Sequence, residues 1–306
     1  MRRPPQWRYR VAMKSSLRSI VARVLLLILL VLRPLALHAQ TPTKIFVASF
    51  GNDANDGSRG SPKRNFQNAH DAIAAGGQIV VLDTAGYGAL TITKSLAVTV
   101  PPGVNGFVTV TGSSANGITI NATATGSVSL RGLIVEGPGG GGSNRGNGIL
   151  VNSVGNLAID DCTVRNFYEG IYVNSITATK CYFRRCTVRG CGYGLDVENN
   201  AGVAVTAIAT GCRLEQSGNT GVYVIPLSNP AGSSADLTLI GCVIAGSNTG
   251  IFGAHANALV RVDNCRITGN NNGVTSSLGA QILSRGNNTL ENNPANNAFT
   301  GPYSAK

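Results

Sequence analysis

Residues 162–173 read CTVRNFYEGIYV, and residues 186–197 repeat the pattern as CTVRGCGYGLDV. Three further copies follow as CRLEQSGNTGVYV (212–224), CVIAGSNTGIFG (242–253) and CRITGNNNGVTS (265–276). Each copy starts with a cysteine, has an aliphatic residue two positions later, and then reaches a glycine followed by another aliphatic residue. The spacings between successive cysteines are 24, 26, 30 and 23 residues. Self-similarity at such a period indicates a solenoid or a repeat array.

Each repeat unit consists of two short β-type runs around a turn, with no helical stretch between them. This combination predicts an all-β fold, a single parallel β-helix of roughly seven to nine turns. The repeat glycine varies in spacing while its neighbours keep their pattern, so we expect strands of constant length joined by corners of variable length. These glycines are Gly117, Gly148, Gly170, Gly194, Gly221, Gly250 and Gly273.

Strand alternation separates core residues from surface residues. Two rows are aliphatic in every copy and are predicted to face the core. One row follows the cysteine by two positions: Val164, Val188, Leu214, Ile244 and Ile267. The other follows the glycine directly: Ile171, Leu195, Val222, Ile251 and Val274.

The first 39 residues differ from the rest of the chain. They hold eight basic residues and no acidic one, and Val24 to Leu32 is an unbroken apolar run before Leu37-His38-Ala39. A basic start, a short apolar core and a small final residue are typical of a secretory signal peptide. The apolar run is too short for an ordinary membrane span, and a signal-anchor is the alternative. We therefore expect a secreted or periplasmic protein without a stable membrane span after signal removal.

Removing residues 1–39 leaves 17 basic and 14 acidic residues, so the positive charge of the chain belongs mainly to the leader. Nucleic acid is therefore not expected as a partner. Export favours disulfides, yet five of the seven cysteines would stack as a buried ladder. Cys181 and Cys191 are the better candidates for a bridge, with each other or with Cys186, and an odd count leaves at least one free thiol.

The N-terminal part is expected to hold a strand, a loop and a short amphipathic helix over 40–78 that caps the solenoid. The β-helix then covers 79–295, and 296–306 forms a tail. The loop with Asp53 and Asp56 is interpreted as turn chemistry, because its acidic residues do not alternate as in a calcium loop. The glycine-rich insert 137–143 is interpreted as a spacer loop.

Several stretches resemble a known group. They are FVASFGNDANDGS (46–58), SPKRNFQNAHDAI (61–73), GGQIVVLDTAGYGALTITKSLAVTV (76–100) and the repeats after Gly148. The chain resembles exported bacterial right-handed parallel β-helix proteins of the pectin-lyase-like superfamily. The resemblance implies a right-handed coil, but it does not fix an activity, because the superfamily includes lyases, hydrolases, epimerases, adhesins and proteins without known activity.

One outward row is rich in aromatic side chains. Two positions after the repeat glycine stand Leu150, Tyr172, Asp196, Tyr223, Phe252 and Thr275. Rings in such a row can stack on sugar faces, so Tyr172, Asp196, Tyr223 and Phe252 are the candidate substrate-binding residues. The alternative is an aromatic ladder that only stabilises the sheet.

A second group of side chains is charged. Asp160 and Asp161 precede one cysteine, and Arg184 and Arg185 precede the next at the same positions, so acid should lie above base. With Arg189 these residues form the candidate catalytic set. In a polysaccharide lyase acting by β-elimination, Arg189 or Lys180 would be the base, and Asp160, Asp161 and Asp196 would lie near a calcium ion. The alternative is a ladder of surface ion pairs.

A glycoside hydrolase is less favoured than a lyase, because only the Asp-Asp pair of the polygalacturonase-like motifs is present. Three hypotheses remain: an exported protein that binds polysaccharide of the uronate type, a lyase, or a structural or adhesive solenoid. The first implies a polysaccharide or cell-surface glycan as partner. No metal ligands are assigned and no cofactor is certain; calcium is possible and is the ion that the lyase alternative would use.

Overall fold

The computed structural model describes residues 41–139, 145–199, 201–226, 232–295 and 298–304. Residues 41–306 form one compact unit. The signal peptide expected over 1–39 lies outside the described residues, as does most of the glycine-rich insert. In the part of the chain that is described, no helix has the length and apolar character needed to cross a membrane.

Three parallel sheets make up this unit. Sheet 1 has eleven strands: β1 (Lys44–Val47), β2 (Gly77–Val81), β5 (Leu96–Thr99), β8 (Ser127–Arg131), β11 (Asn156–Asp160), β14 (Thr179–Arg184), β17 (Ala204–Thr210), β20 (Ser234–Ile240), β23 (Ala258–Asp263), β26 (Gln281–Ser284) and β28 (Gly301–Pro302). Sheet 2 has nine: β3 (Ala85–Gly86), β6 (Gly106–Thr109), β9 (Leu133–Glu136), β12 (Thr163–Arg165), β15 (Thr187–Arg189), β18 (Arg213–Glu215), β21 (Val243–Ala245), β24 (Arg266–Thr268) and β27 (Thr289–Glu291). Sheet 3 has eight: β4 (Leu90–Ile92), β7 (Ile118–Asn121), β10 (Asn147–Ser153), β13 (Glu169–Asn174), β16 (Tyr193–Asn199), β19 (Thr220–Pro226), β22 (Thr249–Ala254) and β25 (Asn272–Ser277).

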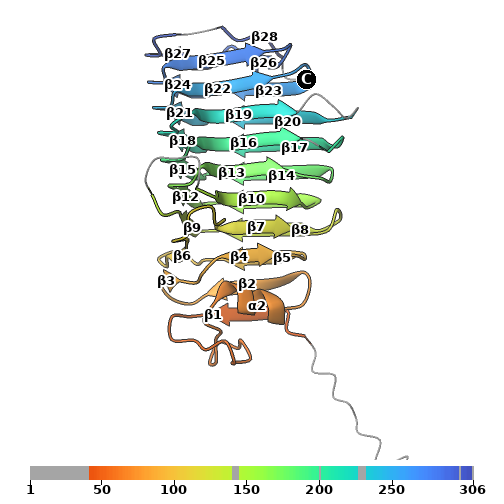
Figure 1. Ribbon diagram of the computed structural model, residues 1–306, viewed down its shortest axis with the longest axis vertical. Helices are drawn as coiled ribbons and strands as arrows, with labels where there is room; N and C mark the ends of the chain where they lie inside the picture. The colour runs from red at the N-terminus through yellow and green to blue at the C-terminus, as the bar shows by residue number, and fades with distance from the viewer. Residues whose placement is uncertain (1–40, 140–144, 200, 227–231, 296–297, 305–306) are drawn as a thin grey trace, which may run out of the picture. The chain divides into compact units, whose positions relative to one another are not determined.

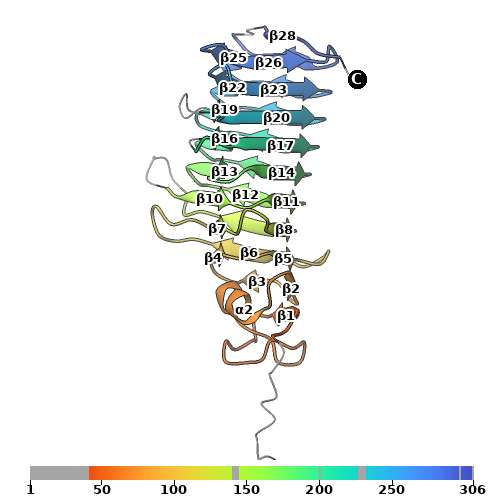
Figure 2. The same ribbon diagram turned by 90° about the vertical axis from the view of Figure 1, so that its right-hand side faces the viewer.

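From β2 to β27 the chain visits the sheets in the same order on each turn, as in β11, β12 and β13, and then returns to sheet 1. Each strand pairs with its equivalent one turn earlier and one turn later, always in parallel. The strands therefore stack one above another within this unit (Figures 1 and 2). The solenoid has about seven turns, which confirms the parallel β-helix predicted from the repeats.

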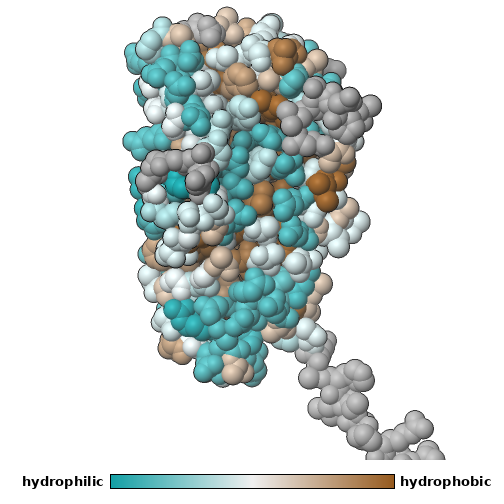
Figure 3. All heavy atoms as spheres, viewed as in Figure 1, coloured by the Kyte–Doolittle hydropathy of each residue, from teal (hydrophilic) through white to brown (hydrophobic). Residues whose placement is uncertain are grey.

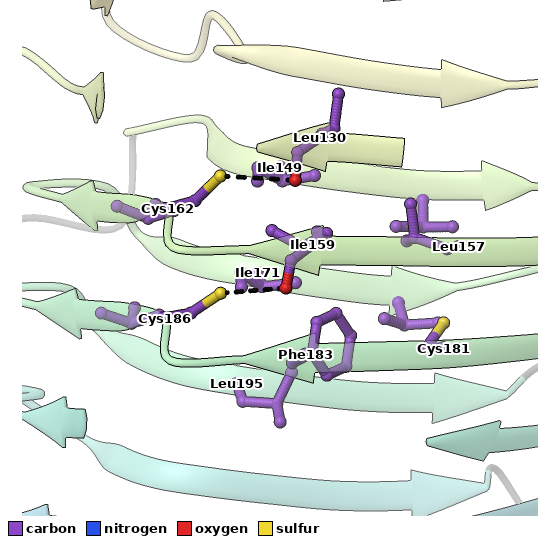
Figure 4. Packing of buried hydrophobic residues seen from close by; sticks show 14 of the residues in the cluster. Leu130, Ile149, Leu157, Ile159, Cys162, Ile171, Cys181, Phe183, Cys186 and Leu195 are labelled. Carbon is purple, nitrogen blue, oxygen red and sulfur yellow. Dashed lines mark hydrogen bonds between the residues drawn. The ribbon is translucent and has the colours of Figure 1, made fainter. Parts of the chain in front are cut away.

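The two aliphatic rows lie in the core as predicted. Val164 pairs in register with Val188, and Ile171 pairs with Leu195, one above the other. Every member of both rows is at most 2% exposed. Figure 4 shows how such residues from successive turns contact one another inside the coil. The hydrophobic core is therefore a column of stacked layers that runs through all the turns.

The repeat glycines are required because the backbone of the next turn lies too close for a side chain. A Cβ on Gly221 would stand 2.9 Å from the carbonyl oxygen of Gly250 and 2.7 Å from the Ile244 side chain. A Cβ on Gly170 would meet the carbonyl oxygen of Gly194 at 2.7 Å. Both glycine and the residue after it are buried, so strict alternation breaks at this point of each strand in sheet 3. Residues on both sides of this break consequently face outward.

The five repeat cysteines form a ladder at the corner between sheets 1 and 2. The Sγ of Cys186 lies 3.2 Å from the carbonyl oxygen of Ile159 on the preceding turn, and Cys162 makes the same contact with Leu130 at 3.8 Å (Figure 4). All seven cysteines are buried, free thiols. The predicted disulfide is therefore wrong. Cys181 faces the core from β14, with Phe183 between it and Cys186, whereas Cys191 lies beyond sheet 2 on the same turn.

The residue before each cysteine has a left-handed backbone. Gly211, Gly241 and Asn264 have φ values of 61°, 60° and 50°, as expected for residues that tolerate this region. Gly132 has the same backbone, with a φ of 74°, before Leu133, which takes the place of the cysteine one turn before Cys162. Asp161 and Arg185 occupy the same corner with φ values of 54° and 51°. These two charged residues therefore stand at positions where the backbone favours glycine.

Different segments lie at the two ends of the coil. At the N-terminal end, α2 (Phe66–Ala72) buries Phe66, Ala69 and His70. At the C-terminal end, Ala295 bonds the backbone of the last sheet 3 strand, since it accepts from the Gly273 N–H at 2.9 Å and donates to the Asn271 carbonyl at 3.0 Å. Strand β28 lies in the stretch that the sequence suggested was a tail and pairs with β26.

Substitution of Gly221 tests the glycine constraint. We expect Gly221→Ala to lower the free energy of unfolding by about 1–3 kcal/mol, because the new methyl group overpacks against a backbone carbonyl that cannot turn aside. Gly86→Ala in β3 is the matched control, since no atom lies within 4 Å of its Cβ position. Urea unfolding of the two variants should separate them, and equal midpoints would contradict this account of the repeat glycine.

Candidate functional site

The outward row of sheet 3 has the register that the repeats predicted. Leu150 pairs with Tyr172, Tyr172 with Asp196, and Asp196 with Tyr223. Tyr223 then pairs with Phe252, and Phe252 with Thr275. The four candidate binding residues therefore lie side by side on four successive turns. One of them differs from the expectation of a surface row, because Asp196 is only 1% exposed.

Two rings that sequence reasoning missed, Tyr193 and Tyr168, lie beside this row. Tyr193 stands directly before the repeat glycine and pairs in register with Glu169 and Thr220, which hold the same position on the adjacent turns; Thr220 is buried. Tyr193 contacts Tyr223 with a ring-centroid distance of 5.0 Å, and Tyr168 lies 5.6 Å from Tyr193. Tyr193 could have been found from the break in alternation at the glycine, which turns the preceding residue outward.

The four rings Tyr168, Tyr193, Tyr223 and Phe252 form one continuous run, which we call the aromatic run. Tyr223 and Phe252 are stacked, with centroids 5.3 Å apart and planes 14° apart. All four side chains are half-buried, so each ring supports its neighbours and keeps an exposed part. The ladder that stabilises the sheet and the surface that could receive a sugar are thus the same set of rings.

Three carboxylates, Glu169, Asp196 and Glu198, lie among these rings, and we call them the acid cluster. Glu198 accepts a 2.7 Å hydrogen bond from the Tyr172 hydroxyl, which itself accepts one from the Asn174 amide at 3.0 Å. The Oδ1 atom of Asp196 has no hydrogen-bond partner among the described residues. A buried carboxyl oxygen without a hydrogen-bond partner destabilises the folded state, so Asp196 lacks a hydrogen-bond donor that a ligand could supply.

Burial and the charges of neighbouring carboxylates raise the pKa values of two of these groups, Glu169 and Asp196. Burial, followed by the charge of Glu198, raises the pKa of Glu169 to about 7. Burial, followed by the charges of Glu198 and Glu169, raises the pKa of Asp196 well above its ordinary value. Burial also raises the pKa of Tyr223 to about 12. Glu169 and Asp196 therefore bind a proton more readily than an ordinary carboxylate does, and a protonated carboxyl group can both donate and accept hydrogen bonds.

Basic residues are segregated from this face. None of the eight strands of sheet 3 contains a lysine or an arginine. The strands of sheets 1 and 2 carry them instead, at Lys44, Arg131, Arg165, Lys180, Arg184, Arg189, Arg213, Arg261 and Arg266. Figure 3, viewed as Figure 1, shows only small apolar patches separated by polar residues across the stack. Nothing on that side resembles the large apolar patch of a protein-docking surface.

The candidate catalytic residues are placed at the end of sheet 1 and on sheet 2. Arg184 forms a bidentate pair with Asp160, with contacts of 2.5 and 2.9 Å, and Arg185 pairs with Asp161 in the same way at 2.7 and 2.9 Å. This confirms the predicted order of acid above base. Arg189 lies on β15 in register with Arg165 and Glu215. Side chains that satisfy one another in this way have the geometry of a surface ion-pair ladder.

The calcium group considered for a lyase is wrong. Asp160 and Asp161 each face an arginine fork at the edge of sheet 1, whereas Asp196 lies on sheet 3. Lys180 is on sheet 1 and Arg189 on sheet 2, so neither base candidate accompanies Asp196. Across the described ranges, no three His, Cys, Asp or Glu side chains are grouped to hold a metal ion.

The Asp53 and Asp56 loop consists of turn interactions. Asp53 accepts hydrogen bonds from the backbone N–H groups of Arg64 and Asn65, both at 2.9 Å. Asp56 accepts one from the Ser58 N–H at 2.9 Å, which lowers the pKa of its carboxyl. These bonds support the interpretation of the loop as turn chemistry.

Comparison with known proteins agrees with this architecture. The family model described as "Right handed beta helix region" matches residues 79–231 and again 116–295. The chain belongs to this right-handed β-helix family. None of the curated proteins matches it.

Among solved structures, the chain is similar to pectate lyase Pel9A, with 13% identity, a TM-score of 0.58, and coverage of 86% of this chain and 78% of that one. It is also similar to the pectin methylesterase PemA from Erwinia chrysanthemi, with 12% identity, a TM-score of 0.50, and coverage of 76% and 80%. At such identities the similarity concerns the fold of this right-handed β-helix protein. The family match confirms the right-handed parallel coil that the resemblance implied.

The acid cluster should give the protein an unusual dependence of stability on pH. A carboxyl whose pKa is raised in the folded state stabilises that state below its unfolded pKa, and this stability is lost as the pH rises through the folded pKa. For Glu169 this interval runs from 4.5 to about 7, and Asp196 acts in the same direction. We expect the Tm to fall across this interval and Glu169→Gln to reduce the fall. Glu291→Gln, an exposed residue on sheet 2, is the control, and a Tm that rises across the interval would contradict the assignment.

The corner occupied by Arg185 yields a separate prediction. Arg185→Gly and Arg185→Ala both remove the pair with Asp161, but only glycine relieves the left-handed backbone. The glycine variant should be more stable than the alanine variant by about 1 kcal/mol. Thermal unfolding of both variants measures this difference, and an alanine variant of equal or greater stability would argue against strain at this corner.

Proposed function

We propose that this protein binds a polysaccharide along the outer face of sheet 3, and that it does so as a secreted or periplasmic protein. The aromatic run is the observation that carries the proposal, because four half-exposed rings follow one another across successive turns. Equivalent positions on adjacent turns lie about 4.8 Å apart, so an extended polymer can contact several rings at once. The apolar face of a sugar ring suits such a surface, and tyrosine adds a polar tip.

The acid cluster supplies the polar part of this surface. Sugars present many hydroxyl groups, and carboxyl groups that are ionised or protonated can accept or donate hydrogen bonds to them. A binding site that combines aromatic walls with a few polar groups fixes both affinity and orientation. The leader expected over residues 1–39 supports an encounter with glycans outside the cytoplasm.

Glycoside hydrolysis is the second candidate, and the raised pKa of Glu169 favours it. A carboxylic acid with a pKa of about 7 is suited to donate a proton to a leaving oxygen, and Asp196 and Glu198 provide further carboxyl groups on the same face. β-Elimination is less well supported, because the strands of sheet 3 contain no basic residue. This reverses the order that we expected from the sequence.

Binding can be tested by co-sedimentation with pectate, alginate and neutral polysaccharides. We expect Tyr223→Ala to weaken retention by about tenfold, as for an aromatic residue at the centre of an interface. Tyr182→Ala is the matched control, because Tyr182 is 42% exposed but lies on sheet 1. Retention that is equal in both variants, or no retention at all, would leave the structural or adhesive solenoid as the better hypothesis.

Chemistry is tested in the same incubations. New reducing ends that disappear in Glu169→Gln would support the hydrolase, whereas new double bonds would support the lyase. The absence of both products together with retention would indicate binding alone. The Tm of every variant should be measured, since loss of a ring also removes part of the ladder.

A further inference from the structure

We infer that the glycan bound by sheet 3 carries protonated amino groups, as an amino-sugar polymer does, and that Glu169, Asp196 and Glu198 select for them. The inference rests on the proposed function, because it concerns the ligand of the same face. It departs from the uronate-type glycan that the sequence suggested. Three observations lead to it: the distribution of charge, the unmet bond of Asp196 and the environment of the acid cluster.

The distribution of charge favours a cation and opposes an anion. All three carboxyl groups come from β13 and β16, at the centre of the aromatic run, and no strand of sheet 3 provides a basic side chain. On sheets 1 and 2 the acids are neutralised instead, for example Asp160 by Arg184 and Asp236 by Arg261. A uronate would add further carboxylates to a face that already holds three, whereas an ammonium group would neutralise them.

Asp196 is the side chain that a ligand would complete. Its Oδ1 lacks a partner within the described part of the chain, and the residue is 1% exposed. Its neighbour Tyr172 cannot supply the bond, because that hydroxyl donates to Glu198. Its other neighbour, Tyr223, packs its ring against Tyr193 and Phe252 in the aromatic run. A donor on the ligand would reach Asp196 after one ring turns aside, a rotamer change that is common on binding.

The environment of the acid cluster predicts a measurable signature. Only the other carboxylates contribute charge effects that shift the pKa values of Glu169 and Asp196, and all of these effects raise them. An ammonium group placed among the three carboxyl groups would reverse this effect and drive protons off. Binding of the correct ligand should therefore release protons at a pH where a neutral sugar releases none.

The test compares oligosaccharides of equal length by calorimetry. The probes are a β-1,4-linked glucosamine hexamer, cellohexaose, which differs from it only by a hydroxyl in place of the amine, and hexagalacturonate. At about pH 6 and low salt, we expect the glucosamine hexamer to bind at least about tenfold more tightly than cellohexaose, and hexagalacturonate to bind most weakly. About 0.5 M salt should remove most of this preference. Titrations in two buffers of different ionisation enthalpy should reveal proton release for the glucosamine hexamer alone.

Variants locate the effect on the acid cluster. Glu198→Gln and Asp196→Asn should each reduce the preference for glucosamine over cellohexaose to about threefold or less. Glu291→Gln on sheet 2 should leave the preference unchanged. Two different positions are used, so a folding defect in one variant does not remove the test.

The outcomes separate this inference from the proposed function. Equal binding of cellohexaose and the glucosamine hexamer would overturn the inference and leave a glycan-binding face. Tighter binding of hexagalacturonate would do the same and restore the uronate. A lysine hexamer that binds as well as the glucosamine hexamer would overturn it too, by showing that charge alone is recognised. Failure of every saccharide to bind would remove the proposed function itself.

Discussion

Backbone pairing between successive turns is the interaction on which the rest of this structure depends. Each strand is hydrogen-bonded to its equivalent on the neighbouring turns, and paired strands lie about 4.8 Å apart. Every position of the repeat therefore lies directly above its own copy. The spacing leaves no room for a Cβ at the repeat glycine, whose neighbour is a carbonyl oxygen. The same spacing makes the core a set of similar layers, in which aliphatic residues lie on aliphatic residues and cysteine lies on cysteine.

The same pairing explains how charge is handled. Stacking in register places like residues next to one another, and like charges in that arrangement repel. Sheets 1 and 2 reduce this cost by pairing acids with bases on adjacent turns, as in Asp160 with Arg184 and Glu136 with Arg165. The strands of sheet 3 carry carboxyl groups and no basic residue, and burial together with the charges of the neighbouring carboxylates raises the pKa values of Glu169 and Asp196. An arrangement that costs stability and is confined to one face indicates a function for that face, because nothing in the fold requires it.

The sequence predicted the features that depend on period alone. The repeat identified the solenoid, the two core rows and the register of Tyr172, Asp196, Tyr223 and Phe252. It could not assign corners to sheets, because corner angles depend on single left-handed residues such as Asp161 and Arg185. The predictions of a disulfide and of a calcium group were both wrong for this reason. Tyr193 was missed because two consecutive buried residues break the alternation, and the burial of Asp196 depends on the neighbouring turns.

The segment around Ala295 has a consequence for growth of the coil. A stack of parallel strands with identical layers is a template that can accept another strand at its open end, as fibrils do. Ala295 occupies the backbone groups of the last turn on sheet 3, and β28 does so on sheet 1. The segment after the last repeat thus blocks the addition of another strand at this end, and it is not itself part of a repeat. Whole turns can then be gained or lost between the two ends over evolutionary time, which would lengthen or shorten the ligand-facing surface while leaving both ends intact.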